Sequence, residues 1–184
     1  MKKFRNTYDF LKANDLHYIS SVLKKLYKSN PYPKRSREHN MWKEQCITNL
    51  PILYLASLYL KEYVKKNGYK SLSFAARDCC HWHKIYSKMF PDDKVTYFRC
   101  SRNMFKVSIK YDRPQFKEYV KSCFGTDDRS LYIDIHGTGA HFIDYCQHIG
   151  FKMPSCFFLS CGAADYSYLP HDKKKHDGIL KPIC

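Results

Sequence analysis

A short run of small and polar residues follows an apolar stretch in the second half of the chain. Residues 134–139 read Asp-Ile-His-Gly-Thr-Gly, and a helical pattern begins directly after them. Gly137 and Gly139 let the backbone come close to a ligand, and the first turn of the following helix directs N–H groups to the same place. Thr138 can donate to a phosphate oxygen, and Asp134 can hold Mg²⁺ or sugar hydroxyls. The run predicts a phosphate-binding loop, with a tight turn capped by Asp134 as the alternative.

Charged and polar residues also follow the other predicted strands. Arg77 and Asp78 follow the first strand, and Ser101 and Arg102 follow the second. Ligands of an open parallel sheet bind beyond the carboxyl ends of its strands, so we expect these side chains to converge with residues 134–139. The arginines would neutralise phosphate charge through paired hydrogen bonds. The candidate ligand-binding residues are Arg77, Ser101, Arg102, His136, Gly137, Thr138 and Gly139, and the candidate catalytic residues are Asp78 and Asp134, with Asp134 also a candidate metal ligand.

Two groups of cysteine and histidine have the residue types of a metal site without its spacing. Residues 79–83 read Cys-Cys-His-Trp-His, and adjacent ligands do not easily close one tetrahedron. The second group joins Cys156 and Cys161 to His171 and His176, but residues five apart on a strand point to opposite faces. We therefore expect no zinc, and Mg²⁺ at Asp134 is the cofactor that the residue types favour.

The elements that must position these residues are short apolar runs separated by helical segments. Strands are expected at 72–76, 95–100, 131–135 and 156–160, and helices between them at about 82–89, 114–122 and 140–149. Alternating strands and helices are typical of βαβ units, which build a parallel sheet. The expected fold class is α/β, with a mostly parallel, four- to five-stranded Rossmann-like sheet and an N-terminal helical segment.

Residues 1–70 have a different pattern, with apolar residues at helical spacing. The spacing predicts one helix over 14–28 and a second over about 38–66, broken or kinked at Pro51 because proline supplies no backbone donor. The second half of that helix is nearly all apolar, so we expect it to be buried and to end at Asn67 and Gly68. We expect one domain over 1–184, made of the basic helical region 1–70, the α/β core 71–162 and a tail 163–184.

The bulk composition limits the compartment. No run of about 18 uncharged apolar residues occurs, and no apolar signal core follows the start, so we expect neither secretion nor a membrane partner. The 9 cysteines are an odd number at irregular spacing, which predicts free thiols in the cytoplasm.

The charge points to anionic partners. The formal net charge is +15, and residues 1–70 hold 15 Lys and Arg against 5 Asp and Glu. Such a field attracts nucleic acid, nucleotides and phosphosugars. Within this region, Lys34, Arg35 and Arg37 are candidate nucleic-acid-binding residues, and a solvated linker is the alternative.

The order of these motifs resembles known proteins over roughly residues 70–162. The runs Ser73–Asp78, Cys100–Arg102 and 131–139 resemble uncharacterised proteins of giant DNA viruses, which would place the chain in the host cytoplasm. The same order resembles type I phosphoribosyltransferases. On that resemblance, residues 77–79 take the place of the pyrophosphate loop and residues 134–141 that of the loop for phosphoribosyl pyrophosphate. The family usually has two adjacent acids there, whereas isoleucines flank Asp134 in this chain.

A further resemblance is to haloacid dehalogenase-like phosphatases. It implies Asp78 as nucleophile, Ser101 as phosphate-binding hydroxyl and Asp134 as metal ligand, although Asp78 lacks the second acid of that family's Asp-x-Asp motif. Three interpretations therefore stay open at this point. They are a phosphoribosyltransferase-like domain, active or degenerate; a nucleic-acid or nucleotide-binding module, for example for an RNA 5′ end; and a viral interaction protein that keeps the fold without a ligand.

Overall fold

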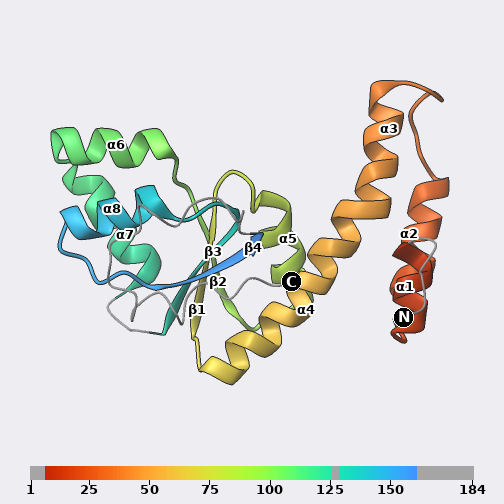
Figure 1. The fold of residues 1–184 in the computed structure, drawn as a ribbon, viewed down its shortest axis with the longest axis horizontal. Helices are drawn as coiled ribbons and strands as arrows, with labels where there is room; N and C mark the ends of the chain where they lie inside the picture. The colour runs from red at the N-terminus through yellow and green to blue at the C-terminus, as the bar shows by residue number, and fades with distance from the viewer. Residues whose placement is uncertain (1–6, 126–128, 161–184) are drawn as a thin grey trace. The chain divides into compact units, whose positions relative to one another are not determined.

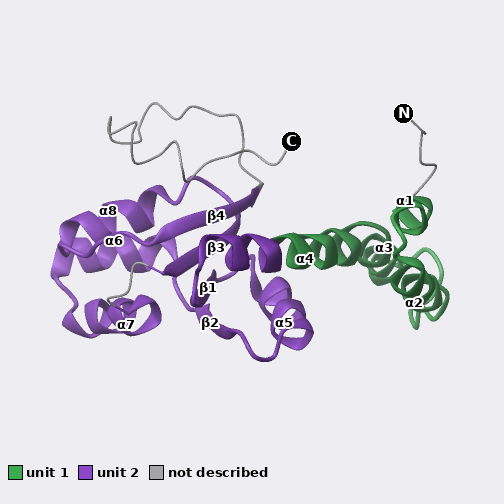
Figure 2. Cartoon of the chain, turned by 90° about the horizontal axis from the view of Figure 1, so that it is seen from below, with its two compact units in different colours: residues 1–59 green, residues 60–184 purple. Residues whose placement is uncertain are grey.

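The computed structural model describes residues 7–125 and 129–160. The chain divides into two compact units, residues 1–59 and 60–184, which are coloured separately in Figure 2. The boundary falls within one long helix, α4 (Leu50–Asn67). No helix in the described part of the chain has the length and apolar content needed to cross a membrane.

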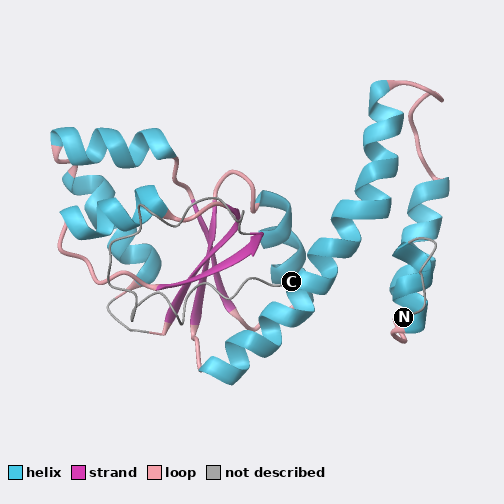
Figure 3. Ribbon diagram, in the orientation of Figure 1, coloured by secondary structure: helices cyan, strands magenta, loops and turns pink. Residues whose placement is uncertain are grey.

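The second unit is built on a parallel four-stranded sheet. Its strands are β1 (Ser71–Ala75), β2 (Lys94–Phe98), β3 (Ser130–His136) and β4 (Ser155–Ser160), and their spatial order is β2-β1-β3-β4 (Figures 1 and 3). The three pairings are all parallel. The predicted α/β class and the predicted parallel sheet are confirmed, and the expected strands differ from the observed ones only at their ends.

One face of this sheet is covered by three helices, α6 (Arg102–Tyr111), α7 (Pro114–Phe124) and α8 (Ala140–His148) (Figure 1). Aromatic rings fill the space between them and the strands. Phe98 of β2 and Tyr132 of β3 contact the ring of Phe142, and Tyr132 stacks on it with 4.6 Å between centroids. The predicted helices at 114–122 and 140–149 are confirmed, but α6 was not predicted.

The opposite face is covered by α5 (Cys80–Met89) and the C-terminal end of α4. Phe74 of β1 packs edge-on against Trp82 of α5, whose ring also approaches Phe157 of β4. β1 and most of β3 are therefore buried on both faces, which explains why their sequences are apolar without strict alternation, whereas β2 at the edge of the sheet is fully buried only at Phe98.

The first unit consists of α1 (Thr7–Ala13), α2 (His17–Lys28), α3 (Arg37–Glu44), a π-helical turn η1 (Gln45–Asn49) and the start of α4. The helix expected to begin at Asn14 begins three residues later. Asp15 has a positive φ of 59°, which the helix cannot contain, so the chain turns there between α1 and α2.

Of the expected break or kink at Pro51, the break is absent, because residues 37–67 stay helical through it by way of the π-helical turn just before the proline. The kink stays a prediction. Proline lacks the N–H that would bond the carbonyl four residues earlier, which belongs to Ile47. The Thr7 hydroxyl donates to this carbonyl instead, at 2.8 Å. A π-turn is one of the ways in which a helix accommodates such a lost bond.

The expectation that the second half of this helix is buried is also wrong in part. One side of α4 is buried, including Leu53, Leu60 and Val64, but Ile52 and Tyr59 are about half exposed. The predicted end of the helix is confirmed, because Gly68 has a positive φ and the Tyr69 N–H donates back to the Val64 carbonyl.

Candidate functional site

The topology singles out one edge of the sheet. The chain leaves β1 in one direction to form β2 and then returns to the other side of β1 to form β3 and β4. The loops after β1 and β3 therefore diverge to opposite faces, towards α5 and α8. In open α/β sheets, ligands bind at such a switch point, beyond the carboxyl ends of the strands.

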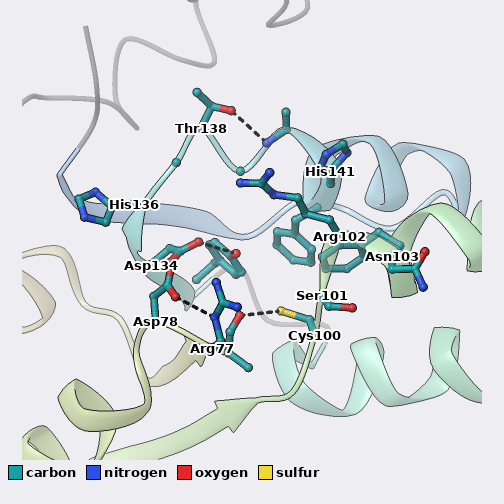
Figure 4. A pocket seen from close by; sticks show the side chains of 17 residues that line it. Arg77, Asp78, Cys100, Ser101, Arg102, Asn103, Asp134, His136, Thr138 and His141 are labelled. Carbon is teal, nitrogen blue, oxygen red and sulfur yellow. Dashed lines mark hydrogen bonds and ion pairs between the residues drawn. The ribbon is translucent and has the colours of Figure 1, made fainter. Parts of the chain in front are cut away.

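A cavity of about 810 Å³ lies at this edge and receives residues from the loops after β1, β2 and β3 (Figure 4). It brings together the nine cavity residues that the sequence singled out, which are Arg77, Asp78, Ser101, Arg102, Asp134, His136, Gly137, Thr138 and Gly139. The convergence expected from the strand ends is thus present, while the roles given to these residues stay predictions.

Asp134 is the most constrained charged group of the cavity. Its Oδ1 accepts the Ile135 N–H at 2.8 Å, and its Oδ2 accepts the Tyr132 hydroxyl at 3.2 Å. Burial raises the pKa of the carboxyl to about 6 despite these two hydrogen bonds, and the nearby Asp78 carboxylate adds to the rise. The carboxylate is therefore held in one orientation in a place that disfavours its charge.

The two arginine side chains of the cavity are exposed and positively charged. The Arg77 side chain is 95% exposed and its Nε lies 3.4 Å from Asp78 Oδ1, while Arg102 is exposed at the start of α6. The peptide bond between Ala76 and Arg77 is cis. In Figure 4 the Arg102 guanidinium points across the cavity towards the loop that carries Thr138. Both side chains can reach an anion without breaking a buried contact.

Two of the cavity hydroxyls, those of Ser101 and Thr138, already accept backbone N–H groups. Ser101 is the N-cap of α6, and its Oγ accepts the Met104 N–H at 3.2 Å. Thr138 Oγ1 accepts the Ala140 N–H at 3.4 Å. Each hydroxyl keeps its own proton to donate, so a phosphate oxygen remains a suitable partner for either.

The glycines of the loop act differently from one another. Gly137 has a φ of 126° and open space where a side chain would begin, whereas Gly139 has a φ of 68° and a Cβ there would lie 3.0 Å from the Phe158 ring. Gly139 also lines the cavity, and its missing side chain makes room for the Phe158 ring, a core contact that the sequence-based interpretation did not include. Gly137 keeps the role of bringing backbone close to the cavity.

Eight further residues line the cavity that were not among the candidate site residues, namely Ala76, Cys100, Asn103, Phe105, Tyr132, Ala140, His141 and Phe142, although Ala140 and His141 lie within the loop 134–141 that the resemblance implies. Tyr132 had a signal, because residues two apart on a strand share a face and Asp134 was already singled out. Asn103 and Phe105 belong to α6, whose start was marked by a serine at the N-cap position. His141 and Phe142 lie in the first turn of α8, the helix that the sequence predicted after Gly139. In Figure 4 the ring of His136 points away from Arg102, at the outer side of the loop.

The cysteines of the site are protonated thiols. Burial and the Asp134 carboxylate raise the pKa of Cys100 to about 12, and burial likewise raises the pKa of Cys79, whose Sγ donates to the Ile133 carbonyl at 3.5 Å. The seven cysteines among the described residues are free. A thiolate nucleophile does not fit these surroundings.

The candidate metal ligands of the cavity are its two carboxylates, Asp134 and Asp78. Mg²⁺ is held in many enzymes by one or two carboxylates together with substrate phosphates, so the preference for Mg²⁺ over zinc stays a prediction from the residue types. Within residues 7–125 and 129–160, no group of three or more His, Cys, Asp and Glu residues is placed to hold a metal ion. Cys79 is committed to the Ile133 carbonyl, and Cys161, His171 and His176 lie outside the described residues.

The candidate nucleic-acid-binding residues lie in the first unit. Lys34 and Arg35 are exposed in the loop between α2 and α3, and Arg37 is the exposed first residue of α3. The sequence thus contains two kinds of candidate site, one in each compact unit.

Comparison of the chain with family models, with curated proteins and with solved structures gives no match.

Proposed function

We propose that the second unit binds a phosphorylated ribose or a nucleotide in the cavity at the carboxyl edge of its sheet, as a phosphoribosyltransferase-like domain. The observation that carries the proposal is the convergence of the loops after β1, β2 and β3 on one cavity that contains two arginines, two carboxylates and a glycine loop. Its volume of about 810 Å³ lies within the range of small-molecule sites, about 300–1,000 Å³.

The phosphates would occupy the space between the arginines and the loop. Arg102 extends from α6 and Arg77 from the loop after β1, so anionic groups can be bound from two sides. The start of α8 adds the positive end of a helix dipole directly after Gly139. Planar guanidinium groups suit phosphate because they donate two parallel hydrogen bonds.

Asp134 would meet the ribose end of the ligand. Its carboxylate is oriented by the Ile135 N–H and the Tyr132 hydroxyl, and it keeps lone pairs for ribose hydroxyls. Bound Mg²⁺ would neutralise phosphate charge, and Asp134 and Asp78 are the residues that would hold it. A buried carboxylate with a raised pKa costs stability, and such groups gather at functional sites.

A transferase would displace pyrophosphate from the C1 carbon of the ribose by an attacking nucleophile. The new bond forms at C1, and the pyrophosphate leaves with the electron pair of the broken C–O bond. Arg77 is the residue that would stabilise the leaving pyrophosphate. The proposal needs only the binding function, and release of pyrophosphate distinguishes an active domain from a degenerate one.

Thermal unfolding in the presence of ligands tests the proposal. Phosphoribosyl pyrophosphate, ribose 5-phosphate and nucleotides, each with and without Mg²⁺, should raise the melting temperature, because a ligand at 100 times its Kd adds about 2.7 kcal/mol. Arg102→Ala should weaken the best ligand about tenfold or more. The matched control is Arg99→Ala, since Arg99 is also exposed after β2 and does not line the cavity.

The proposal is refuted if none of these phosphorylated ligands raises the melting temperature. It is also refuted if Arg102→Ala and Arg99→Ala lower the ligand affinity equally. The outcome would then favour the third interpretation, in which the fold is kept for interaction with another protein.

A phosphatase of the haloacid dehalogenase type would instead hydrolyse a phosphate ester and lose that activity in Asp78→Asn.

A further inference from the structure

The loop between α2 and α3 is held rigidly from both helices. The Trp42 indole donates to the Leu26 carbonyl at 2.8 Å, and the Asn30 amide donates to the His39 carbonyl at 3.0 Å. Asn30 also accepts the Tyr32 N–H, and Ser36 accepts the His39 N–H as the N-cap of α3. A basic stretch that served only as a solvated linker would not need this set of hydrogen bonds.

The side chains that this framework presents are exposed. The loop surface, defined as Tyr32, Lys34, Arg35 and Arg37, consists of one aromatic ring and three cations. Tyr32 is 43% exposed and contacts the Trp42 ring edge-on at 6.2 Å. Within the described residues, none of the three cations forms an ion pair, so their charge remains available to a partner.

Arg35 occupies a backbone conformation that does not suit arginine. Its φ is 69°, in the left-handed region that glycine and asparagine adopt at lower cost. A residue kept at such a position against its conformational preference points to a use for its side chain. The strained position lies between Lys34 and Ser36, in the middle of the loop surface.

We propose that the loop surface binds single-stranded nucleic acid, with Lys34, Arg35 and Arg37 at the phosphates and Tyr32 stacked on a base. Proteins that bind single strands combine a cationic track with exposed aromatic rings, because every base has a face on which a ring can stack. A duplex hides those faces, so the exposed tyrosine favours a single strand. This site lies within residues 30–37 and is independent of the function proposed for the cavity.

Fluorescence anisotropy with a labelled oligouridine of about 12 nucleotides tests the proposal on the full chain. The triple variant K34A/R35A/R37A should lose most of the affinity and reduce the salt slope by about two units, since each single-strand phosphate contact contributes about 0.7. The control triple K12A/K65A/K66A removes the same charge from exposed helical lysines and should change the slope little. Tyr32→Leu should weaken binding about tenfold, and Tyr32→Phe should retain it.

Equal losses in the two triple variants would overturn the proposal, because they would assign the binding to the overall positive field. Equal affinity of the wild type for a duplex of the same length would overturn the single-strand assignment, and Tyr32→Leu without effect would do the same. Circular dichroism melting verifies that each variant is folded. Absence of oligouridine binding by the wild type would also refute it, whatever the thermal-shift result for the cavity.

Discussion

The two units carry arginines in contrasting surroundings. Arg77 and Arg102 line a cavity together with carboxylates, glycines and the start of a helix. In the loop between α2 and α3, Arg35 and Arg37 lie on an exposed segment without a carboxylate partner among the described residues. Similar residue types thus lie in two different surroundings, and we expect these surroundings to suit different partners.

A concave site suits a small molecule, because several elements of the protein can contact the molecule at once and exclude water from it. An open cationic loop suits a polymer, whose successive phosphates each release counterions. Four predictions follow this contrast, from the largest expected effect to the smallest.

Gly139→Val should destabilise the second unit by about 3 kcal/mol. The valine would adopt a positive φ and its Cβ would lie 3.0 Å from the Phe158 ring, so the buried ring has to move. Urea denaturation measures the loss, and Gly137→Ala, where only the backbone is strained, should lose less. Equal stabilities of Gly139→Val and the wild type would show that the core tolerates a side chain there.

The double variant R77A/R102A should lower the affinity for the best phosphorylated small ligand by about 3 kcal/mol, since each variant side chain loses at least one hydrogen bond to a charged group, worth about 1.5 kcal/mol at the lower end. It should leave oligouridine binding nearly unchanged. The loop variant K34A/R35A/R37A should show the opposite pattern. Calorimetric titration of both variants with both ligands tests the contrast, which fails if one variant loses both activities.

Asp134→Asn should stabilise the second unit at neutral pH by about 2 kcal/mol. Burial raises the pKa of this carboxyl from its ordinary 3.8 to about 6, so folding favours its protonated form. The stability that Asp134 contributes is complete below about pH 3.8 and is lost as the pH rises through 6. The variant, which does not titrate, should therefore match the wild type in acid and exceed it above pH 6.

Thermal melts at pH 4 and pH 7.5 measure this difference. The same variant should bind the phosphorylated ligand less well, so stability and binding would change in opposite directions. If the Asp134 carboxylate serves only to cap its own turn, Asp134→Asn should melt at a lower temperature than the wild type at both pH values.

Arg35→Gly should leave the first unit as stable as the wild type or stabilise it by up to about 0.5–1 kcal/mol, because glycine adopts a φ of 69° without strain. The same change should reduce oligouridine affinity. Chemical denaturation followed by circular dichroism checks the first effect. A clear destabilisation would mean that the arginine serves the fold rather than a partner.

Much of the second unit was predictable from local sequence. Its strands are short, mostly apolar runs with single polar residues such as Thr96 and Asp134, and its helices carry clear start and end residues, as at Pro114 and Gly150. Helix α6 was missed because only two of its residues, Phe105 and Ser108, are buried, so few core positions mark it in the sequence. In the first unit, the continuation of the helix past Pro51 depended on a bond from Thr7, which is 40 residues away from Ile47.

The sequence by itself determined the fold class and the identity of the nine cavity residues, because the ends of parallel strands meet at one edge whatever their loops contain. Only the tertiary structure decided how those residues are used. The Ser101 hydroxyl caps helix α6, and the Tyr132 hydroxyl donates to Asp134. The position where a Gly139 side chain would begin faces the Phe158 ring. The Gly139–Phe158 contact joins elements that are far apart in the sequence, so no local pattern of residue types encodes it. The other two contacts are local, but packing decides which rotamer each side chain adopts.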